Sequence, residues 1–401
     1  MRIKILISLG IFCFLALSAG GCVGGQQKPL GFSGVISYDG ILYLGSTDGK
    51  IVAVNPSARN QEMSFPSSDG EWSFAITMPS KGISCGPSSV PVSIYGTPTV
   101  VGESVCIGTY NGKVLMMNLS ARSQNLDFPQ VRSGEWVYPR TEDVIEPIVG
   151  SPVVADDTVY VSSSDGRVYA LDRTYGDEKW KSDPLGDKLW ITPVVEEETV
   201  YVSTFDGHIY ALSAKDGSLL PWAFKAEAGF ASSPMLYENT IFAGSFDRNL
   251  YAVKIGDNDM VMQNDMMMPK ELLWKFPGGN WFWATPVAKD GVVYAGCLDG
   301  KVYAIDSKTG NELWEFDAGS PIVSSPALTD DLLVVACDSG EVYALDIFNG
   351  KLINGVSIDA PIRGSLCIQE GIVYIRAQDN CLYAMDVGKG KINWRFPLTI
   401  K

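Results

Sequence analysis

The sequence predicts an eight-bladed β-propeller, an all-β fold of four-stranded antiparallel blades. Three features predict it: a Ser/Thr-Pro step that recurs every 40 to 50 residues or so, a later Tyr-Ala pair in an apolar strand, and a tryptophan after that strand. Periods of this length are typical of propellers and solenoids, whose units bury their apolar faces against their neighbours. A solenoid needs polar capping repeats. Neither end of this chain carries one, so we expect a closed ring.

The Ser/Thr-Pro step marks the first strand of each blade. Proline is tolerated there because this strand is a sheet edge that lines the central channel. Six copies occur, and two degenerate copies flank them: Gly34-Val35, Thr97-Pro98, Ser151-Pro152, Thr192-Pro193, Ser233-Pro234, Thr285-Pro286, Ser325-Pro326 and Ser365-Leu366.

The remaining strands of each blade follow in a fixed order. A second alternating strand leads to an Asp-Gly corner such as Asp165-Gly166, for which we expect a type I′ turn. The third strand reads Val168-Tyr169-Ala170-Leu171 and recurs in later blades. Large rings on the fourth strand fill the wide outer gap between blades. They are Trp72, Trp136, Trp180, Trp222, Trp274, Trp314 and Trp394, with Asn354 in the seventh blade.

This repeat resembles the PQQ-type propeller repeat, over about residues 31–400. The eight repeats and the leader described next are also similar to the BamB-like lipoproteins of the outer-membrane assembly machinery. The wider family includes quinoprotein dehydrogenases, and that resemblance implies pyrroloquinoline quinone (PQQ) with calcium at the channel as an alternative.

The first 21 residues read as a lipoprotein signal peptide. Arg2 and Lys4 precede an apolar run, and small residues lead to Cys22, the expected lipid anchor. Ordinary cleavage that leaves Cys22 free is the alternative. We therefore divide the chain into a signal peptide (1–21), a short tether (22–30) and the propeller (31–401). We expect an exported, extracytoplasmic protein that is attached to a membrane only through its lipid.

Charge and histidine content narrow the function classes. The net charge is −15, which argues against nucleic-acid binding, because such proteins carry a basic footprint. His208 is the only histidine, so the commonest general base and metal ligand is almost absent.

Six cysteines follow Cys22. An exported location permits disulfides, and Cys85 with Cys106 is the bridge we expect. Cys297 and Cys337 occupy equivalent strand positions, where we expect small buried side chains. The pairing of Cys367 and Cys381 stays open.

No catalytic residue is predicted. The chain has no adjacent-cysteine pair and no Cys-x-x-Cys-His haem motif, and it is short for a quinone-dependent dehydrogenase. Its recurrent aspartates are explained by turn capping.

The residues two positions before each Ser/Thr-Pro step should form a ring at one mouth of the channel. Four aromatic residues and an arginine of that ring, with two nearby aromatic residues, form our predicted binding surface. Alternatively, these rings plug the channel or pad its loops. The predicted surface comprises Phe32, Tyr95, Trp190, Phe230, Trp281, Trp283 and Arg363.

Two insertions interrupt the repeats. The first, from Pro79 to Val92, should be an irregular loop. The second, from Gly256 to Pro269, carries Met260, Met262 and Met266, whose thioethers suit copper(I) or an adaptable partner surface. A loop that tucks its methionines against the fifth blade is the simpler interpretation.

Together these features predict a monomeric, non-catalytic scaffold that binds a protein or peptide partner in the cell envelope. The alternatives are a PQQ-dependent dehydrogenase and a carbohydrate- or small-ligand-binding propeller.

Overall fold

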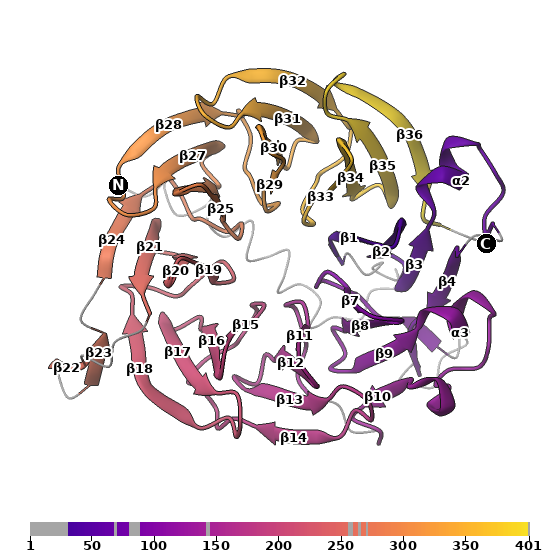
Figure 1. Ribbon diagram of the computed structural model, residues 1–401, viewed down its shortest axis with the longest axis horizontal. Coiled ribbons are helices and arrows are strands. Elements are labelled where there is room, and N and C mark those ends of the chain that lie inside the picture. The colour runs from indigo at the N-terminus through magenta and orange to yellow at the C-terminus, as the bar shows by residue number, and fades with distance from the viewer. Residues whose placement is uncertain are drawn as a thin grey trace, which may run out of the picture.

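The computed structural model describes residues 31–67, 70–79, 89–141, 145–255, 260–263, 266–269 and 272–399. In these residues, eight four-stranded antiparallel sheets follow one another around a ring (Figure 1). The predicted eight-bladed propeller is confirmed. The strands of each blade run in chain order from the channel to the rim.

The blades have the following bounds. Blades one to four comprise β1 (Val35–Tyr38), β2 (Ile41–Gly45), β3 (Lys50–Val54) and β4 (Trp72–Ala75); β7 (Thr99–Val101), β8 (Ser104–Gly108), β9 (Val114–Asn118) and β10 (Trp136–Tyr138); β11 (Val153–Ala155), β12 (Thr158–Ser162), β13 (Val168–Asp172) and β14 (Glu178–Lys181); and β15 (Val194–Glu196), β16 (Thr199–Ser203), β17 (His208–Ser213) and β18 (Leu219–Lys225). Blades five to eight comprise β19 (Met235–Tyr237), β20 (Thr240–Gly244), β21 (Asn249–Lys254) and β24 (Leu272–Pro277); β25 (Val287–Lys289), β26 (Val292–Gly296), β27 (Lys301–Asp306) and β28 (Glu312–Asp317); β29 (Ala327–Leu328), β30 (Leu332–Ala336), β31 (Glu341–Asp346) and β32 (Leu352–Ser357); and β33 (Cys367–Gln369), β34 (Ile372–Ala377), β35 (Cys381–Asp386) and β36 (Lys391–Pro397).

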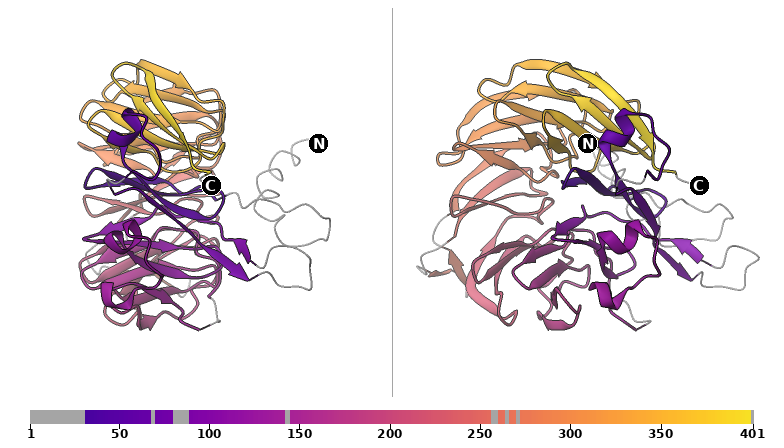
Figure 2. Two further views of the ribbon diagram at one scale, coloured as in Figure 1. Left: turned by 90° about the vertical axis from the view of Figure 1, so that its right-hand side faces the viewer. Right: turned by 45° about the vertical axis from the view of Figure 1, so that its right-hand side comes forward.

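Two extra hairpins lie outside the blades. β5 (Thr77–Pro79) pairs with β6 (Ser89–Pro91), so the ends of the first insertion form a hairpin where we expected an irregular loop. This hairpin extends away from the ring (Figure 2). β22 (Met260–Gln263) pairs with β23 (Met266–Pro269) at the rim, where β23 lies against β18 of blade four (Figure 1). The expected packing of the methionines against blade five concerns side chains outside the described residues and stays a prediction.

The Asp-Gly corners between second and third strands differ from the expected type I′ turn. That turn needs positive φ at both central residues, but only the glycine has it here, as at Gly166 (φ 78°) and Gly300 (φ 91°). The aspartate instead caps the corner: Asp299 Oδ1 accepts from the Lys301 N–H (2.9 Å), and its Oδ2 accepts from the Tyr303 hydroxyl (2.7 Å). Burial, followed by the equivalent bond to Asp379, raises the pKa of Tyr383 to about 12.

Each tryptophan of the fourth strand packs against the next blade. The ring of Trp180 lies so close to Gly217 that a Cβ there would come within 2.4 Å of it. Its indole N–H also donates to the Ala214 carbonyl (2.9 Å). In blade seven, the Asn354 amide donates to the Val387 carbonyl (2.9 Å) in the same way, so asparagine keeps the polar part of the contact.

The first two blades carry a duplicated module that the sequence analysis missed. A short helix between the third and fourth strands, α2 (Pro56–Asn60) or α3 (Leu119–Ser123), presents a buried arginine to a buried glutamate. The pairs are Arg59 with Glu71 (2.7 Å) and Arg122 with Glu135 (2.8 Å). In the second blade a 3₁₀ turn, η1 (Val131–Ser133), precedes the glutamate. Removing one partner of such a buried pair costs about 3–5 kcal/mol, because the other charge is left buried without compensation.

The ring closes without a shared strand. The last blade, β33–β36, lies beside the first blade (Figure 1), where the Val35 N–H donates to the Ser365 carbonyl (3.3 Å) and the Thr47 N–H donates to Asn380 Oδ1 (2.9 Å). Among the described residues, no helix has the length and apolar character needed to cross a membrane.

Two tryptophans give a matched test of the contact between blades. Trp180 donates its N–H, whereas the buried N–H of Trp222, next to the insertion, has no hydrogen-bond partner among the described residues. We expect Trp180→Phe to lower the free energy of unfolding by about 1 kcal/mol more than Trp222→Phe, because only the first change breaks a hydrogen bond. Urea unfolding of both variants measures this difference, and equal losses would contradict it.

Candidate functional site

Each blade is reached through a lead-in segment, the residues just before its Ser/Thr-Pro step. The residue three positions before the step is apolar and fully buried in blades two to eight: Ile94, Ile148, Leu189, Phe230, Phe282, Ile322 and Ile362. It inserts against the second strand of the preceding blade. A Cβ at Gly108 would come within 2.4 Å of Ile148, and a Cβ at Gly244 within 2.4 Å of Phe282.

The next residue along each lead-in segment faces the channel. All eight residues two positions before the step line one cavity, as the sequence predicts for their arrangement: Phe32, Tyr95, Val149, Trp190, Ala231, Trp283, Val323 and Arg363. We call this ring the mouth. The cavity at its centre has a volume of about 130 Å³. That is below the range of about 300–1,000 Å³ that encloses small ligands.

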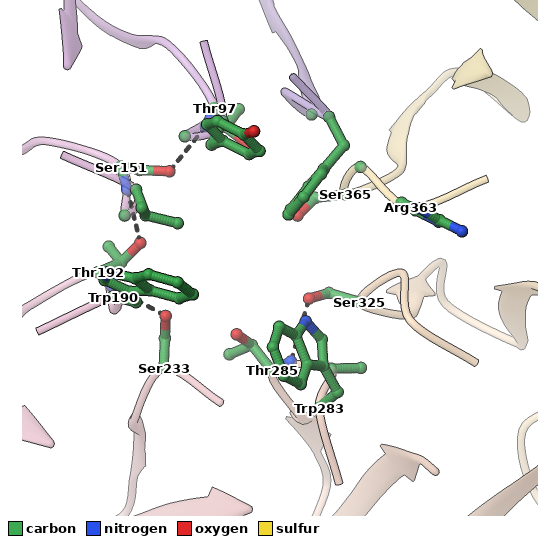
Figure 3. A pocket seen from close by; sticks show the side chains of 18 of the residues that line it. Thr97, Ser151, Trp190, Thr192, Ser233, Trp283, Thr285, Ser325, Arg363 and Ser365 are labelled. Carbon is green, nitrogen blue, oxygen red and sulfur yellow. Dashed lines mark hydrogen bonds between the residues drawn. The ribbon is translucent and has the colours of Figure 1, made fainter. Parts of the chain in front are cut away.

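Below the mouth, the Ser/Thr residues of the steps form a belt of hydrogen bonds (Figure 3). The backbone N–H of Thr97 donates to Ser151 Oγ (2.9 Å), that of Ser151 to Thr192 Oγ1 (2.9 Å), and that of Thr192 to Ser233 Oγ (2.9 Å). In the same way, the backbone N–H of Thr285 donates to Ser325 Oγ (3.2 Å). The belt fixes neighbouring blades at the channel and thereby holds the mouth residues in place.

Five half-buried rings form a continuous arc along the mouth from blade four to blade six: Trp190, Phe205, Phe246, Trp281 and Trp283. Ring centroids are 5.1 Å apart for Trp190 and Phe205, 5.4 Å for Phe205 and Phe246, and 5.0 Å for Phe246 and Trp281. Trp190 and Trp283 both reach toward the opening (Figure 3). We call these five residues the aromatic arc.

Phe205 and Phe246 were missed by the sequence analysis. Each precedes the Asp of a corner, and its backbone N–H donates to the lead-in segment of its own blade, as Phe246 does to the Gly229 carbonyl (2.8 Å). Tyr110 holds the same position in blade two, and its ring centroid lies 5.1 Å from that of Tyr95. Aromatic residues just before the corner were the available signal.

Phe230 does not belong to the mouth, which corrects the prediction. It is fully buried, and its ring centroid lies 6.0 Å from that of Tyr251 and 6.4 Å from that of Phe224. The alternation of side chains along the lead-in segment points Phe230 toward the core between the blades. Trp281 does not line the central cavity, but it joins the surface through Phe246.

The mouth offers little for acid–base chemistry. Its ionisable side chains are Arg363 and Tyr95. Arg363 Nε donates to Asp338 Oδ1 (2.7 Å), and both side chains are about one-third exposed. Burial, followed by the neighbouring Tyr110, raises the pKa of Tyr95. His208 lies on β17, with its Nδ1 3.1 Å from Asp206 Oδ1 and its ring stacked on Tyr210.

The residues around the channel do not fit PQQ with calcium. Calcium binds oxygen ligands, carboxylates above all, and no carboxylate lines the cavity. Within the described ranges, no group of three or more His, Cys, Asp or Glu side chains is arranged to hold a metal ion.

The remaining predicted residues lie elsewhere. Cys106 is a free and fully buried thiol, which contradicts the expected bridge, and Cys85 lies outside the described residues. Cys297 and Cys337 are free and buried as expected, and burial raises the pKa of each to about 12. The signal peptide and Cys22 lie outside the described residues. Met260, Met262 and Met266 lie on β22 and β23, whose side chains are outside the description.

A larger hollow of about 910 Å³ lies between the first two blades, beside β5. Its walls include the apolar side chains of Phe74, Ile76, Leu115 and Phe128, with Lys113 among its polar lining. The sequence gave no signal for this hollow, because residues from several separate connections form it.

These features define an eight-bladed propeller of the PQQ-repeat class, with a narrow channel that opens into an aromatic mouth. The sequence matches the family described as "Outer membrane protein assembly factor BamB" over residues 24–182, 180–261 and 298–399, and the chain belongs to that family.

Two solved structures are similar to the chain. BamB from Moraxella catarrhalis has 16% sequence identity and a TM-score of 0.64, with 88% of this chain and 93% of that chain covered. The computationally designed Ika8 protein has 15% identity and a TM-score of 0.64, with 90% and 97% covered. A comparison with curated proteins finds no match. Because a designed protein is as similar as a natural one, this likeness shows the fold alone.

Adjacent residues test which side chains hold the fold and which form the surface. Phe282 is fully buried, whereas Trp283 is half-buried at the mouth. We expect Phe282→Ala to lower the free energy of unfolding by about 3–5 kcal/mol and Trp283→Ala by at most about 1 kcal/mol. Chemical denaturation measures both values. A loss for Trp283→Ala as large as that for Phe282→Ala would mean that this ring serves packing.

Proposed function

We propose that this chain is a non-catalytic scaffold of the cell envelope that binds a protein or peptide segment across the mouth. The aromatic arc carries the proposal. Half-exposed Trp side chains line the same mouth as Arg363, and Trp and Arg are residue types that dominate the binding energy of protein interfaces. Membership of a family described as an outer-membrane assembly factor supports both the location and a protein partner.

The geometry of the mouth favours an extended partner over an enclosed small ligand. The central cavity is about 130 Å³, so a ligand must lie mainly on the arc and not inside the channel. The rings contact one another in tilted and edge-to-face pairs, which fixes their orientation before binding and lowers the entropy that a partner must overcome.

Attachment to the membrane is part of the proposal. Cys22 carries the lipid, and residues 22–30 tether the ring to the membrane surface. A partner that is itself embedded in the membrane would then meet the mouth at a high effective concentration.

A photo-crosslinking experiment tests the proposal. p-Benzoylphenylalanine replaces Trp283 at the mouth or, as a control, Phe348, which is 78% exposed on the turn between β31 and β32. We expect the probe at position 283 to capture a discrete envelope protein in intact cells. Trp190→Ala and Trp283→Ala should each weaken binding of that purified protein at least about tenfold, whereas Phe348→Ala should not. Capture from position 348 and not from position 283 would overturn the proposal.

A carbohydrate is the second candidate ligand, because the half-exposed Trp rings of the arc also offer flat apolar faces to sugar rings. A glycan array probed with the wild type and the Trp190→Ala/Trp283→Ala double variant separates the two candidates. Glycan binding that the double variant loses, without any protein crosslink, would favour the sugar.

Quinone-dependent oxidation is the remaining alternative, and it has its own test. Because the channel lining lacks carboxylates, we expect incubation with PQQ and Ca²⁺ to give no stoichiometric complex by absorbance and native mass spectrometry. A stoichiometric complex that requires calcium would overturn the non-catalytic proposal.

A further inference from the structure

The seam between the last and first blades contains an arginine where other blades have a small residue. Arg376 lies on β34, next to the end of the second strand of blade eight. The equivalent residues in blades one to seven are Gly45, Gly108, Ser162, Ser203, Gly244, Gly296 and Ala336. In the other blades this position faces the lead-in segment of the following blade, and the following blade here is the first.

The lead-in segment of blade one is correspondingly reduced. Its residue three positions before the step is Gly31, where the other seven blades have a buried Ile, Leu or Phe. This seam therefore has the reverse of the usual sizes, with a glycine at the lead-in position and a large side chain on the second strand. The strand alternation places Arg376 on the same face of the sheet as Tyr374, which packs in a cluster with residues of the first blade.

This guanidinium is buried without a hydrogen-bond partner. Arg376 is 1% exposed, and its Nε, Nη1 and Nη2 atoms make no hydrogen bond to any residue that the structure describes. Burial lowers its pKa to about 10, with partial compensation from Asp379 and Asp48, so the group stays charged at neutral pH. A buried, unpaired charge is among the most destabilising features a fold can contain.

The two nearby carboxylates are already engaged. Asp379 Oδ2 accepts from the Tyr383 hydroxyl (2.6 Å) and from Arg395 Nη2 (3.0 Å). Asp48 Oδ1 accepts from Ser46 Oγ (2.5 Å), and its Oδ2 lies 3.3 Å from Lys50 Nζ. Neither carboxylate reaches Arg376, so the side-chain donors of Arg376 need an acceptor from outside the described chain.

We propose that the seam binds a small monovalent anion, of the size of chloride, on the guanidinium of Arg376. Asp379 and Asp48 compensate the buried positive charge only in part and make no hydrogen bond to it, so the proposed partner is a single negative charge. A small ion suits a guanidinium that is 1% exposed. Arginine presents five N–H donors in a rigid fork, of which several can converge on one anion.

The anion would stabilise the closed ring. The described hydrogen bonds across this seam include those from Val35 to Ser365, from Thr47 to Asn380 and from Ser37 to Gln369. An anion held at Arg376 lets the charged side chain fill the seam without an unpaired charge. This inference concerns closure of the ring and does not depend on what binds at the mouth.

Bromide locates the site directly. Crystals of the wild-type protein grown or soaked in sodium bromide are measured at the bromine absorption edge. We expect an anomalous peak within hydrogen-bond distance of the Arg376 guanidinium. Density at the guanidinium that consists only of water or of residues from this chain would overturn the proposal.

Thermal unfolding gives an independent test in solution. Sodium chloride replaces sodium gluconate at constant ionic strength, and the unfolding midpoint of the wild type should rise by about 3 °C over a hundredfold range of chloride above the dissociation constant. Arg376→Met, which keeps an unbranched side chain of similar length, should lose this dependence. The control variant Arg173→Met removes the same charge from an exposed position and should keep it.

Equal chloride dependence in the wild type and Arg376→Met would contradict the site. If Arg376→Met fails to fold, the bromide experiment on the wild type still decides the question.

Discussion

The arrangement of the whole ring depends on one repeated contact, the insertion of an apolar lead-in side chain into the second strand of the preceding blade. Ile148 packs against Gly108, and Phe282 packs against Gly244. In both contacts the apolar side chain lies so close that a residue with a Cβ could not replace the glycine without a shift. The contact brings neighbouring sheets close together at the channel, where space is smallest. The fourth-strand tryptophans maintain the spacing at the rim, where the gap is widest.

The same contact creates the mouth. Once Phe282 is fixed in the core, backbone alternation turns the next side chain, Trp283, toward the opening. The corner of the preceding blade is tied to the chain that leads into this segment, because the Gly278 N–H donates to the Arg248 carbonyl (2.8 Å). The Phe246 ring of that corner lies beside Trp281 and Trp283. The aromatic arc is therefore supported by elements of the core, and a partner would meet a surface that is largely preorganised.

The sequence allowed the blades, the mouth positions and the substitution of Asn354 for tryptophan to be predicted, because each depends on a repeat that can be compared across copies. Phe230 was misplaced because its nearness to the mouth in sequence was weighed above the alternation that buries it. The type I′ turn predicted for the corners was wrong. The Asp side chain accepts a hydrogen bond from a backbone N–H of the corner, as Asp299 does from Lys301, and the aspartate keeps a negative φ. Phe205 and the Arg122–Glu135 pair were missed although each recurs, Phe205 as Phe246 before the next corner and the ion pair as Arg59–Glu71. Their contacts join residues that are distant in the sequence and form only in three dimensions.

Departures from the repeat fall into two physical classes. In the first, the changed residue has hydrogen-bond partners within the chain. Asn354 donates a hydrogen bond where an indole N–H would, and Glu135 accepts from the backbone N–H groups of Asn118 and Gln130 and from the Arg122 side chain. In the second, a buried polar group has no partner among the described residues, as with the Trp222 indole beside the inserted hairpin and Arg376 at the seam. Departures of the first class preserve the ring. Those of the second class have a free-energy cost that the fold does not recover by itself, so they point to positions where something outside the described chain contributes to stability.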